Sequence, residues 1–568
     1  MTETGATQGS GARVGVSSTL TSGVERTFPT LTLEQVERIA VHGRVRQIRP
    51  GEVLVQPGDQ IVPFFVVTAG GVEIVRPSSA SETLVVLYGP GQFTGEVNML
   101  SGRPALLQVR ASEAGEVIEV EREQLLALVQ TDSQLGEIIM RAFILRRVEL
   151  IAHGLGDVVL LGSNHCSGTL RVKEFLTRNG HPYSYIDLDR DADVQVLLDR
   201  FHVTGGDVPV LICRGETVLR NPTNQQIASC LGFNEAIDPT HIRDVVIVGA
   251  GPAGLAAAVY AASEGLDVLV LETNSPGGQA GSSSKIENYL GFPSGISGHD
   301  LATAAYAQAQ KFGAKVMVAR SATRLECGRR PYVIDVDHGE RIEGRIVIIA
   351  SGAEYRKLSI PDVERFEGAG IYYSATPMEG KLCAGEEVVV VGGGNSAGQA
   401  AVFLAEDAKH VHVLVRASGL ADSMSRYLIN RIGQHPRITL HARTQVVAVA
   451  GKAHLENITW RVSDNGESVS STIRHLFVMA GAVPNTTWLE GCVALDDKGF
   501  IKTGGDLTPE DLVRWPLSRP PYLLETSLPG VFAVGDVRSG NLKRVASAVG
   551  EGSIAVALAH RVLREGNA

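Results

Sequence analysis

The sequence has few cysteines and no surplus of positive charge. Its cysteines form no C-x-x-C pair and no metal-ligand spacing, so neither a zinc site nor a secreted disulfide framework is indicated. The formal net charge of -10 argues against nucleic-acid binding, which needs a basic face. These absences favour a reducing, cytoplasmic setting. The cysteines are Cys166, Cys213, Cys230, Cys327, Cys383 and Cys492.

The sequence pattern also lacks a targeting or membrane segment. Residues 1–26 are rich in glycine, serine and threonine without an apolar core, which predicts a disordered tail rather than a signal peptide. The longest uncharged apolar run, 245–262, contains a glycine- and proline-rich turn, so we predict no membrane span. With 63 glycines and 44% hydrophobic residues, the chain predicts an α/β protein of roughly three to five domains.

The stretch 244–279 carries a complete dinucleotide fingerprint. A β-branched run over 244–248 predicts a buried strand that enters GAGPAG at 249–254 and then an alanine-rich helix. A second predicted strand, 268–271, ends in Glu272, whose carboxylate is placed to accept hydrogen bonds from a ribose. The turn suits a pyrophosphate at the helix N-terminus. The predicted binding residues are Gly249, Gly251, Pro252, Ala253, Gly254 and Glu272.

The same pattern returns at 387–397 as EVVVVGGGNSA, which predicts a second dinucleotide site. Arg416 lies where the first site has its acid, and an arginine there favours the 2'-phosphate of NADPH over the free hydroxyl of NADH. The predicted binding residues of this site are Gly392, Gly394, Asn395, Ser396, Ala397 and Arg416.

Residues 27–153 predict a β-roll with short strands, Pro-Gly turns and closing helices. The stretches GEVLVQPGDQIVPFFVVTAGGVEIV and GPGQFTGEVNMLSG make this segment similar to the cyclic-nucleotide-binding domains. The resemblance implies that Gly95 and Glu96 hold a cyclic nucleotide. The family's phosphate-binding arginine is replaced by Ala105, and Arg103 could substitute for it. Two interpretations stay open, namely an effector site at Gly95, Glu96 and Arg103, or a structural or dimerisation module.

Residues 156–233 predict a βαβ order with helices near 167–179 and 193–202, followed by Val-Pro before a hairpin. This order resembles the thioredoxin/glutaredoxin fold, which implies a cis peptide at Pro209 and an attacking thiol at Cys166. A helix N-terminus at Cys166 would lower the pKa of its thiol. Thr169 replaces the resolving cysteine, so the site is monothiol at best. The alternative is a docking domain in which Cys166 is inert.

From Arg243 to the end, the chain resembles the low-molecular-weight thioredoxin reductases. The matching segments are the two fingerprints, PGGQ at 276–279, IENY at 286–289, and GVFAVGD at 530–536 with the KRVA helix start at 543–546. The resemblance implies FAD and NADPH as cofactors, NADH as a second choice, a homodimer, and Arg426 as a further NADPH contact. It adds to the FAD site Gly278, Gln279, Asn288, Gly535, Asp536, Arg544, Val545 and Ala546.

The redox dithiol of those reductases, CATC, is absent. The matching stretch at 373–377 is YSATP, and Cys383 nearby is interpreted as a buried apolar residue before a strand. Reduced flavin must therefore pass its electrons to oxygen, a quinone, a one-electron carrier or a thiol/disulfide partner. The alternative function is a ligand- or redox-sensing regulatory flavoprotein with little turnover.

Together these patterns predict a multidomain chain. It would hold an N-terminal β-roll, a thioredoxin-like α/β domain, and two Rossmann-like α/β domains, the second inserted in the first. The expected boundaries are a tail at 1–26, the β-roll at 27–153, the thioredoxin-like domain at 156–233, the FAD domain at 243–357 and 483–568, and the NAD(P)H domain at 358–482.

Overall fold

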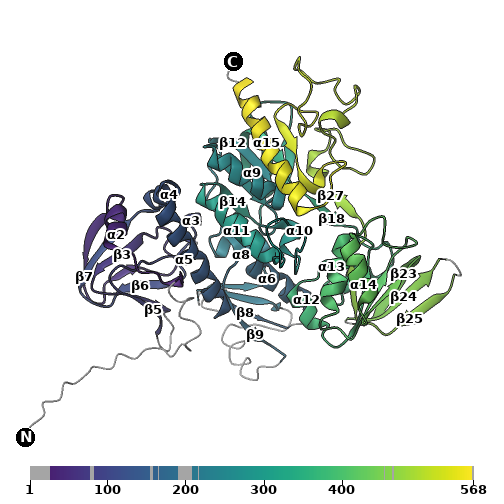
Figure 1. Cartoon of the computed structure of the whole chain (residues 1–568), viewed down its shortest axis with the longest axis horizontal. Helices are drawn as coiled ribbons and strands as arrows, with labels where there is room; N and C mark the ends of the chain where they lie inside the picture. The colour runs from purple at the N-terminus through teal and green to yellow at the C-terminus, as the bar shows by residue number, and fades with distance from the viewer. Residues whose placement is uncertain are drawn as a thin grey trace, which may run out of the picture. The chain divides into compact units, whose positions relative to one another are not determined.

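The computed structural model of the chain describes residues 26–76, 82–96, 98–153, 158–163, 166–189, 207–214, 217–452, 454–463 and 466–565. Residues 1–25 of the predicted tail and the predicted helix at 193–202 lie outside these ranges. Contacts divide the chain into two compact units, one of residues 1–99 and 107–150, the other of residues 100–106 and 151–568. Figure 1 labels their elements.

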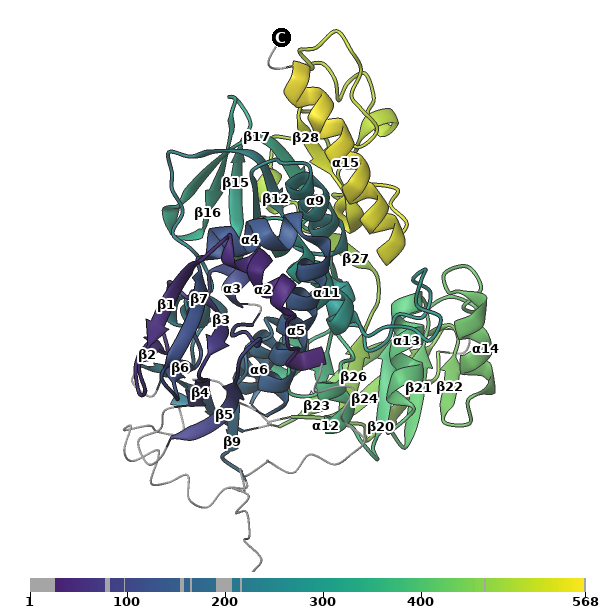
Figure 2. The ribbon, with the colours of Figure 1, turned by 60° about the vertical axis from the view of Figure 1, so that its left-hand side comes forward.

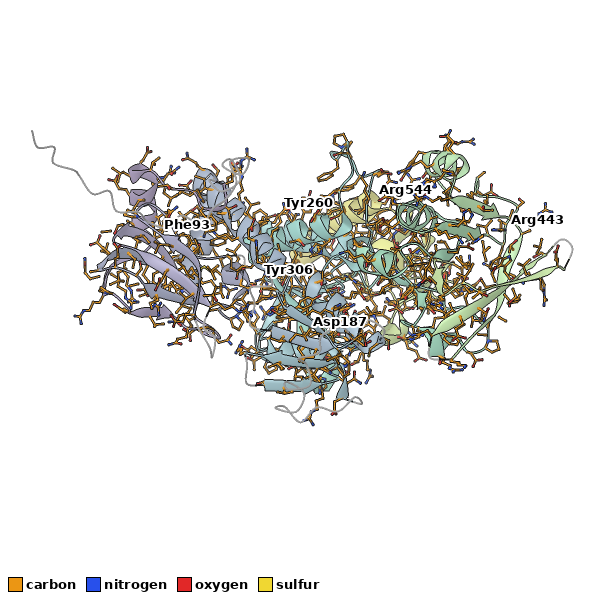
Figure 3. The ribbon with its side chains drawn as sticks, turned by 90° about the horizontal axis from the view of Figure 1, so that it is seen from below. Phe93, Asp187, Tyr260, Tyr306, Arg443 and Arg544 are labelled. Carbon is orange, nitrogen blue, oxygen red and sulfur yellow. A yellow bond between two sulfur atoms is a disulfide. The ribbon has the colours of Figure 1, made fainter. Side chains whose placement is uncertain are left out.

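The first unit is a β-roll with two antiparallel sheets, of strand orders β1-β7-β3 and β2-β6-β4-β5. Its core centres on three packed rings, Phe64, Phe93 and Phe143, with centroids 5.4 to 6.4 Å apart. Phe93 is labelled in Figure 3. The elements are α2 (Leu33–Ala40), β1 (Arg44–Ile48), β2 (Val53–Val55), β3 (Phe64–Ala69), β4 (Val72–Arg76), β5 (Thr83–Tyr88), β6 (Gln108–Ala111), β7 (Gly115–Val120), α4 (Arg122–Thr131) and α5 (Ser133–Ala152), while α3 (Asn98–Ser101) straddles both units.

The second unit starts with a small sheet of order β11-β10-β8-β9, in which β8 and β9 are parallel and the other pairs antiparallel. We call residues 158–233 the small-sheet unit. The Val208–Pro209 peptide is cis, as the sequence predicts. The elements are β8 (Val158–Gly162), α6 (Ser167–Arg178), β9 (Ser184–Asp187), β10 (Val210–Cys213), β11 (Thr217–Arg220) and α8 (Asn224–Cys230). Asp187, at the end of β9, is labelled in Figure 3.

The largest sheet has the order β14-β13-β12-β17-β16-β15, with β28 beside β17. Alternate residues of β12 and β13 face an alanine-rich layer of helices, and the others face a second apolar core, as expected for strands buried on both faces. In Figure 1, α9 and α15 lie side by side over this sheet. The strands are β12 (Ile242–Val248), β13 (Val268–Glu272), β14 (Lys315–Val318), β15 (Ala322–Glu326), β16 (Tyr332–Val336), β17 (Arg341–Ile349) and β28 (Val531–Ala533); the helices are α9 (Pro252–Ser263), α10 (Gly278–Gly281), α11 (Gly298–Lys311) and α15 (Val545–Glu565).

A second parallel sheet, of order β19-β26-β20-β21-β22, is formed by residues between the two parts of the first. Figure 2 shows it in green, with α13 and α14 beside β21 and β22. The elements are β18 (Ala353–Tyr355), β19 (Ile371–Tyr372), α12 (Pro377–Leu382), β20 (Glu387–Val391), α13 (Asn395–Leu404), β21 (His410–Leu414), α14 (Arg426–Gln434), β22 (Ile438–His441), β23 (Thr444–Gly451), β24 (Leu455–Val462), β25 (Ser468–Ser471), β26 (His475–Val478) and β27 (Ala482–Pro484). β18 pairs with β27 where the chain passes between the two sheets.

One disulfide, between Cys327 and Cys492, joins segments on either side of the second sheet in sequence. The sequence spacing gave no indication of this pair, because the two cysteines are 165 residues apart and meet only through the fold. Among the described residues, no helix is long and apolar enough to cross a membrane, and no group of three or more His, Cys, Asp or Glu side chains could hold a metal ion.

Candidate dinucleotide sites

The first glycine turn leaves the carboxyl end of β12 and enters α9. Gly249 has a φ of +106°, a conformation that favours glycine. A Cβ on Gly254 would lie 1.9 Å from the Gly249 carbonyl oxygen, so helix and turn can pack this closely only with glycine at 254. A Cβ on Gly251, by contrast, would meet nothing nearer than the Cα of Gly278, at 3.9 Å. The turn therefore has an open cradle of the kind a pyrophosphate needs.

Glu272 ends β13 and points back into this turn. Its Oε2 accepts a hydrogen bond of 2.7 Å from the Ala250 amide, and its Oε1 accepts bonds from the Asn274 and Ser275 amides at 2.9 and 3.2 Å. Burial raises the pKa of this carboxyl group, and the three amides partly oppose that shift. A carboxylate has capacity for about four hydrogen bonds, so the ribose-binding role predicted for Glu272 is compatible with these contacts.

The segment 276–281 closes over the turn. The Gly277 amide donates to the Ala250 carbonyl at 2.8 Å, and Gly278 follows in the left-handed region with a φ of +53°. A Cβ on Gly278 would lie 3.0 Å from the Cα of Gly251. Gln279 donates from its amide to the Ala353 carbonyl. Asn288, also predicted for this site, is exposed.

The C-terminal part of the site lies where β28 ends and α15 begins. The Gly535 amide donates to Glu551 at 2.7 Å, and Lys543 Nζ donates to the Asp536 carbonyl oxygen at 3.3 Å. Burial raises the pKa of Asp536. α15 starts at Val545, as predicted; Arg544, labelled in Figure 3, and Ala546 are exposed. The open cradle at Gly251 and these groups fit FAD. The roles of Glu272 at the ribose and of Asp536 at the ribityl chain stay predictions.

The second glycine turn links β20 to α13. Gly392 has a φ of +145°, and a Cβ there would lie 2.4 Å from the Met479 carbonyl oxygen. Ala397 occupies the position that Gly254 has in the first turn, and it is fully buried. Two contacts hold the following loop against the turn. Ser423 Oγ donates to the Gly393 carbonyl at 2.8 Å, and Asn395 Oδ1 accepts from the Ser425 amide at 2.8 Å.

Tyr355 on β18 lies near both predicted nucleotide sites. Burial is the main cause of its raised pKa, and Ser396, in the first turn of α13, and Asp536 of the FAD site also affect this pKa.

The two arginines predicted to read the 2'-phosphate are both exposed. Arg416 directly follows Val415 beyond β21, and Arg426 is the first residue of α14. Their role in binding NADPH stays a prediction.

The stretch that replaces the dithiol is closed by hydrogen bonds. The Thr376 amide donates to Glu379 Oε2 at 2.8 Å, and its hydroxyl donates to the same oxygen. Burial raises the pKa of Glu379. Cys383 is fully buried, as predicted, and burial raises the pKa of its thiol to about 12. This thiol is therefore not a nucleophile at neutral pH.

Cys166 is the N-cap residue of α6, where the sequence placed it. A Cβ on Gly168 would lie 2.8 Å from Cδ of Pro209, so the cis proline packs on the first turn of this helix. A Cβ on Gly368 would lie 2.8 Å from Cβ of Ser167. The N-terminal end of α6 therefore packs against Gly368, which precedes Ser374 by six residues in the sequence.

In the β-roll, Glu96 is paired within its own unit. Its Oε2 lies 3.3 Å from Nη1 of Arg147, a side chain of α5 that is 5% exposed. Arg146 donates to the Gly95 carbonyl at 2.9 Å. Sequence reasoning missed both arginines, because a mid-helix arginine has the pattern of a solvent-facing residue.

Arg103 belongs to the second unit and is buried there. It donates to the Asn179 carbonyl at 3.2 Å and to the Tyr306 hydroxyl at 3.1 Å, and its guanidinium stacks 4.3 Å from the Phe233 ring centroid. Tyr306 is labelled in Figure 3. The guanidinium would have to leave these partners to reach a phosphate, so the effector role predicted for Arg103 has no support from its contacts.

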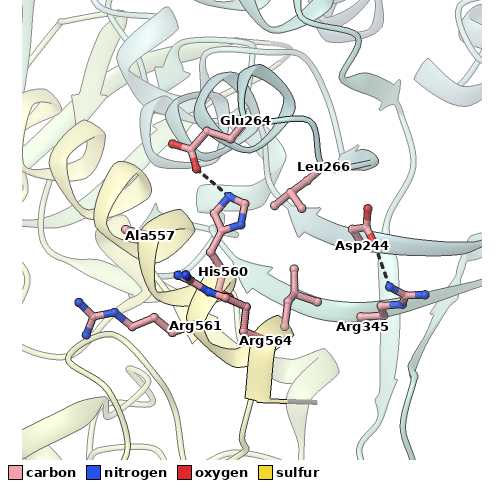
Figure 4. A pocket seen from close by; sticks show the side chains of 9 residues that line it. Asp244, Glu264, Leu266, Arg345, Ala557, His560, Arg561 and Arg564 are labelled. Carbon is pink, nitrogen blue, oxygen red and sulfur yellow. Dashed lines mark hydrogen bonds and ion pairs between the residues drawn. The ribbon is translucent and has the colours of Figure 1, made fainter. Parts of the chain in front are cut away.

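A hollow lined by charged and apolar side chains lies at the opposite edge of the first sheet. It is lined by Asp244 at the start of β12 and by residues near the ends of α9 and α15, with the pairs Glu264–His560 at 2.6 Å and Asp244–Arg345 at 3.3 Å (Figure 4). The dinucleotide turn lies at the carboxyl end of β12, where ligands of parallel sheets bind. The hollow is therefore separate from the predicted cofactor site.

Each glycine turn follows the carboxyl end of a strand that has parallel neighbours, and the next strand leads to an acid in the first site and to an arginine in the second. This arrangement fits two dinucleotides, as in the flavoprotein oxidoreductases. The comparisons agree. Residues 243–552 match the family model of the pyridine nucleotide-disulphide oxidoreductases, and residues 45–132 match that of the cyclic nucleotide-binding domain. The first match spans more than half of the chain, so the chain belongs to the pyridine nucleotide-disulphide oxidoreductase family.

Similar proteins are thioredoxin reductases. The chain is 34% identical to NADPH-dependent thioredoxin reductase 3 of Arabidopsis thaliana over 62% of its own length and 66% of that protein's. It is 32% identical to thioredoxin reductase of Streptomyces clavuligerus over 57% of its own length and 94% of that protein's. Crystal structures of the enzymes from Lactococcus lactis and T. acidophilum each match 57% of the chain and 99% of theirs, at 27% and 30% identity and TM-scores of 0.51.

The chain is therefore a thioredoxin reductase-like oxidoreductase fused to a cyclic nucleotide-binding domain, as the resemblances predicted. FAD and NADPH are the cofactors of that reductase family, which agrees with the acid in the first fingerprint and the arginine in the second.

Proposed function

We propose that the chain passes a hydride from NAD(P)H to FAD and then electrons to an acceptor that is not reached through a dithiol at 374–377. FAD supplies the redox chemistry when bound. The chain's own residues bind and orient the two nucleotides, the first turn and Glu272 for FAD and the second turn with Arg416 for NADPH. No side chain is needed as a general acid or base for a hydride transfer.

The observation that carries this proposal is the closed stretch at 374–377. Thr376 is tied to Glu379, and the nearby thiol of Cys383 is buried with a pKa of about 12. Ordinary thioredoxin reductase activity should therefore be nearly absent.

The test is NADPH and NADH consumption by the flavin-loaded chain with a panel of acceptors: oxygen, a quinone, a one-electron carrier, thioredoxin, and a disulfide with a low-molecular-weight thiol. We expect turnover with at least one acceptor other than thioredoxin. Rapid reduction of thioredoxin by both the wild type and Cys166→Ser would contradict the proposal. Bound FAD without turnover on any acceptor would favour the alternative, a regulatory flavoprotein.

We also propose that residues 156–233 are a thioredoxin/glutaredoxin-like domain. The sheet order, the cis proline against the first turn of α6, and Cys166 as the N-cap support this assignment. A relay through Cys166 would form a mixed disulfide that an added thiol must resolve, because Thr169 is not a cysteine. If Cys166→Ser abolishes disulfide-dependent turnover but leaves quinone turnover intact, the relay operates. If it changes neither, the domain has a docking role.

For the β-roll we propose weak or no binding of cyclic nucleotides. Ala105 replaces the phosphate arginine, and Glu96 is already paired with Arg147 at 3.3 Å. Titration calorimetry with cyclic AMP and cyclic GMP tests this proposal. Tight binding of either nucleotide would overturn it.

A further inference from the structure

The helix that begins after Cys166 ends against the FAD turn. α6 has 12 residues and is therefore about 18 Å long. At its C-terminal end, Arg178 Nη2 donates a hydrogen bond of 2.7 Å to the Gly278 carbonyl oxygen. The Arg178 side chain is 14% exposed. Its Nε is buried and has no hydrogen-bond partner among the described residues. A nearly buried guanidinium thus reaches the FAD domain from a different part of the chain.

The backbone that Arg178 holds is the part that covers Gly251. The Cα atoms of Gly278 and Gly251 are so close that a Cβ on Gly278 would lie 3.0 Å from Cα of Gly251. A Cβ on Gly281 would lie 3.6 Å from Arg178 Nη2. Movement of the Gly278 carbonyl would therefore change the opening above Gly251, where the pyrophosphate is expected.

A second set of hydrogen bonds connects the small-sheet unit to the acid of the FAD site. Arg171 Nη1 donates to Asn224 Oδ1 at 2.7 Å, and Asn224 Nδ2 donates to Asn274 Oδ1 at 2.9 Å. The Asn274 amide donates to Glu272 Oε1 at 2.9 Å. The contacts of Arg178 and Asn224 converge on the loop between Glu272 and Gly278.

Arg178 is also a charged neighbour of Glu272. Burial raises the pKa of the Glu272 carboxyl group, and the positive charge of Arg178 is one of several smaller effects, with the amide hydrogen bonds, that lower it. The other charged and titratable groups around Arg178 are Glu174, 3.2 Å away on the same helix, and His299 on α11. Burial lowers the pKa of His299, so this imidazole is neutral at pH 7 and does not compete with the arginine.

We propose that Arg178 is a positioning residue of the FAD site, which holds Gly278 over Gly251 and presents a positive charge to Glu272. The small-sheet unit is then a fixed component of the flavin site, and FAD binding depends on its attachment. This inference rests on the proposed FAD function. It adds a residue that neither fingerprint contains.

The test is the dissociation constant of FAD for the full-length apoprotein, followed by flavin fluorescence, in wild type, three Arg178 variants and one control variant. Arg178→Met removes the charge and the hydrogen bond, and we expect FAD binding at least about tenfold weaker, since a hydrogen bond to a charged group contributes about 1.5 to 3 kcal/mol. Arg178→Gln keeps a donor without the charge and should be intermediate. Arg178→Lys should bind nearly as wild type. Lys173→Met removes a charge on the same helix above Tyr185 and is the matched control, with no expected change.

The pH dependence of FAD binding distinguishes a positioning role of Arg178 from a role in packing alone. Without Arg178 the pKa of Glu272 rises further, so on acidification FAD affinity should fall at a higher pH in Arg178→Met than in wild type, and Arg178→Lys should restore the profile. A His299→Gln background removes the imidazole from this comparison. If Arg178→Met and Arg178→Gln bind FAD within twofold of wild type, the proposal is wrong.

Equally weakened FAD binding in all three Arg178 variants at every pH would also overturn the proposal, because a packing defect alone explains that result. If Arg178→Met does not fold, Arg178→Gln and Arg178→Lys decide the question in the same way. A wild-type apoprotein that binds no FAD would instead refute the proposed function, which keeps the two failures distinct.

Discussion

The glycine turns after β12 and β20 place the same backbone pattern at the carboxyl edges of two parallel sheets, but their surroundings differ. In the first turn Gly254 touches the Gly249 carbonyl so closely that a methyl group cannot fit, whereas the second turn has Ala397 at that position. The strand that follows the first turn and its helix ends in Glu272, a buried acid that accepts three amide hydrogen bonds. The corresponding residue of the second site is Arg416, which is exposed. The first turn is therefore tightly constrained and the second more tolerant.

Substitutions at the last position of each turn, Gly254 in the first and Ala397 in the second, should give the largest difference in stability and FAD content. Gly254→Ala would place a Cβ 1.9 Å from a backbone oxygen that cannot move away, and overpacking costs about 1 to 3 kcal/mol or more. We expect Gly254→Ala to lose most of its FAD and much of its stability. Ala397→Gly should cost only about 1 kcal/mol, the helix propensity difference. Denaturant unfolding and the flavin content per chain measure both. Similar losses in the two variants would show that the turns are equally constrained.

The buried acid of the first turn should make apoprotein stability depend on pH. Burial raises the pKa of Glu272 in the folded chain, so the folded chain binds this proton more tightly than the unfolded chain does. The protonated Glu272 side chain therefore adds to the free energy of unfolding. This stabilisation is fully present below the unfolded pKa of about 4.5 and is lost as the pH rises through the folded pKa. Each unit by which the folded pKa exceeds the unfolded pKa adds about 1.4 kcal/mol to the free energy of unfolding at low pH.

Glu272→Gln should lack this decline, and unfolding free energies of the apoprotein between pH 4 and 8 test the expectation. Arg416→Gln is the control from the second turn, because an arginine stays charged throughout and its removal should leave the pH profile unchanged. Identical profiles for wild type and Glu272→Gln would mean that the carboxyl group is not protonated in the folded apoprotein.

The contrast between the turns also shows what the sequence can predict. Both fingerprints, the α15 start, the cis proline and the buried Cys383 follow from local pattern or from family motifs, because glycine spacing and strand-helix order determine them. Arg178, the Arg147–Glu96 pair and the Cys327–Cys492 disulfide join residues far apart in the chain. No periodicity connects such partners, so they become visible only when the fold brings them together.

The arginine of the second turn should control nucleotide choice with an intermediate effect. Arg416 is followed by ASGLA at 417–421, so no second arginine stands directly beside it in the sequence. A charge-assisted contact is worth about 1.5 to 3 kcal/mol, so Arg416→Ala should lower the NADPH preference over NADH by roughly ten- to hundredfold. The ratio of kcat/KM for the two nucleotides measures it, with Arg461→Ala, at an exposed position of β24, as the control. An unchanged ratio in Arg416→Ala would place the reading of the 2'-phosphate elsewhere.

The smallest expected effect concerns Tyr355, which lies near both predicted nucleotide sites. Burial raises the pKa of its hydroxyl group, and Ser396, at the start of α13, and Asp536 of the FAD site also affect this pKa. Tyr355→Phe removes the hydroxyl group and keeps the ring, so it should cost no more than one neutral hydrogen bond, about 0.5 to 1.5 kcal/mol. We expect slower flavin reduction by NADPH in rapid mixing, with the dissociation constants of FAD and NADPH unchanged. Ser396→Ala removes the neighbouring hydroxyl group, and the double variant should be no slower than either single variant if the two groups act together. Additive slowing in the double variant would show that the two side chains act independently.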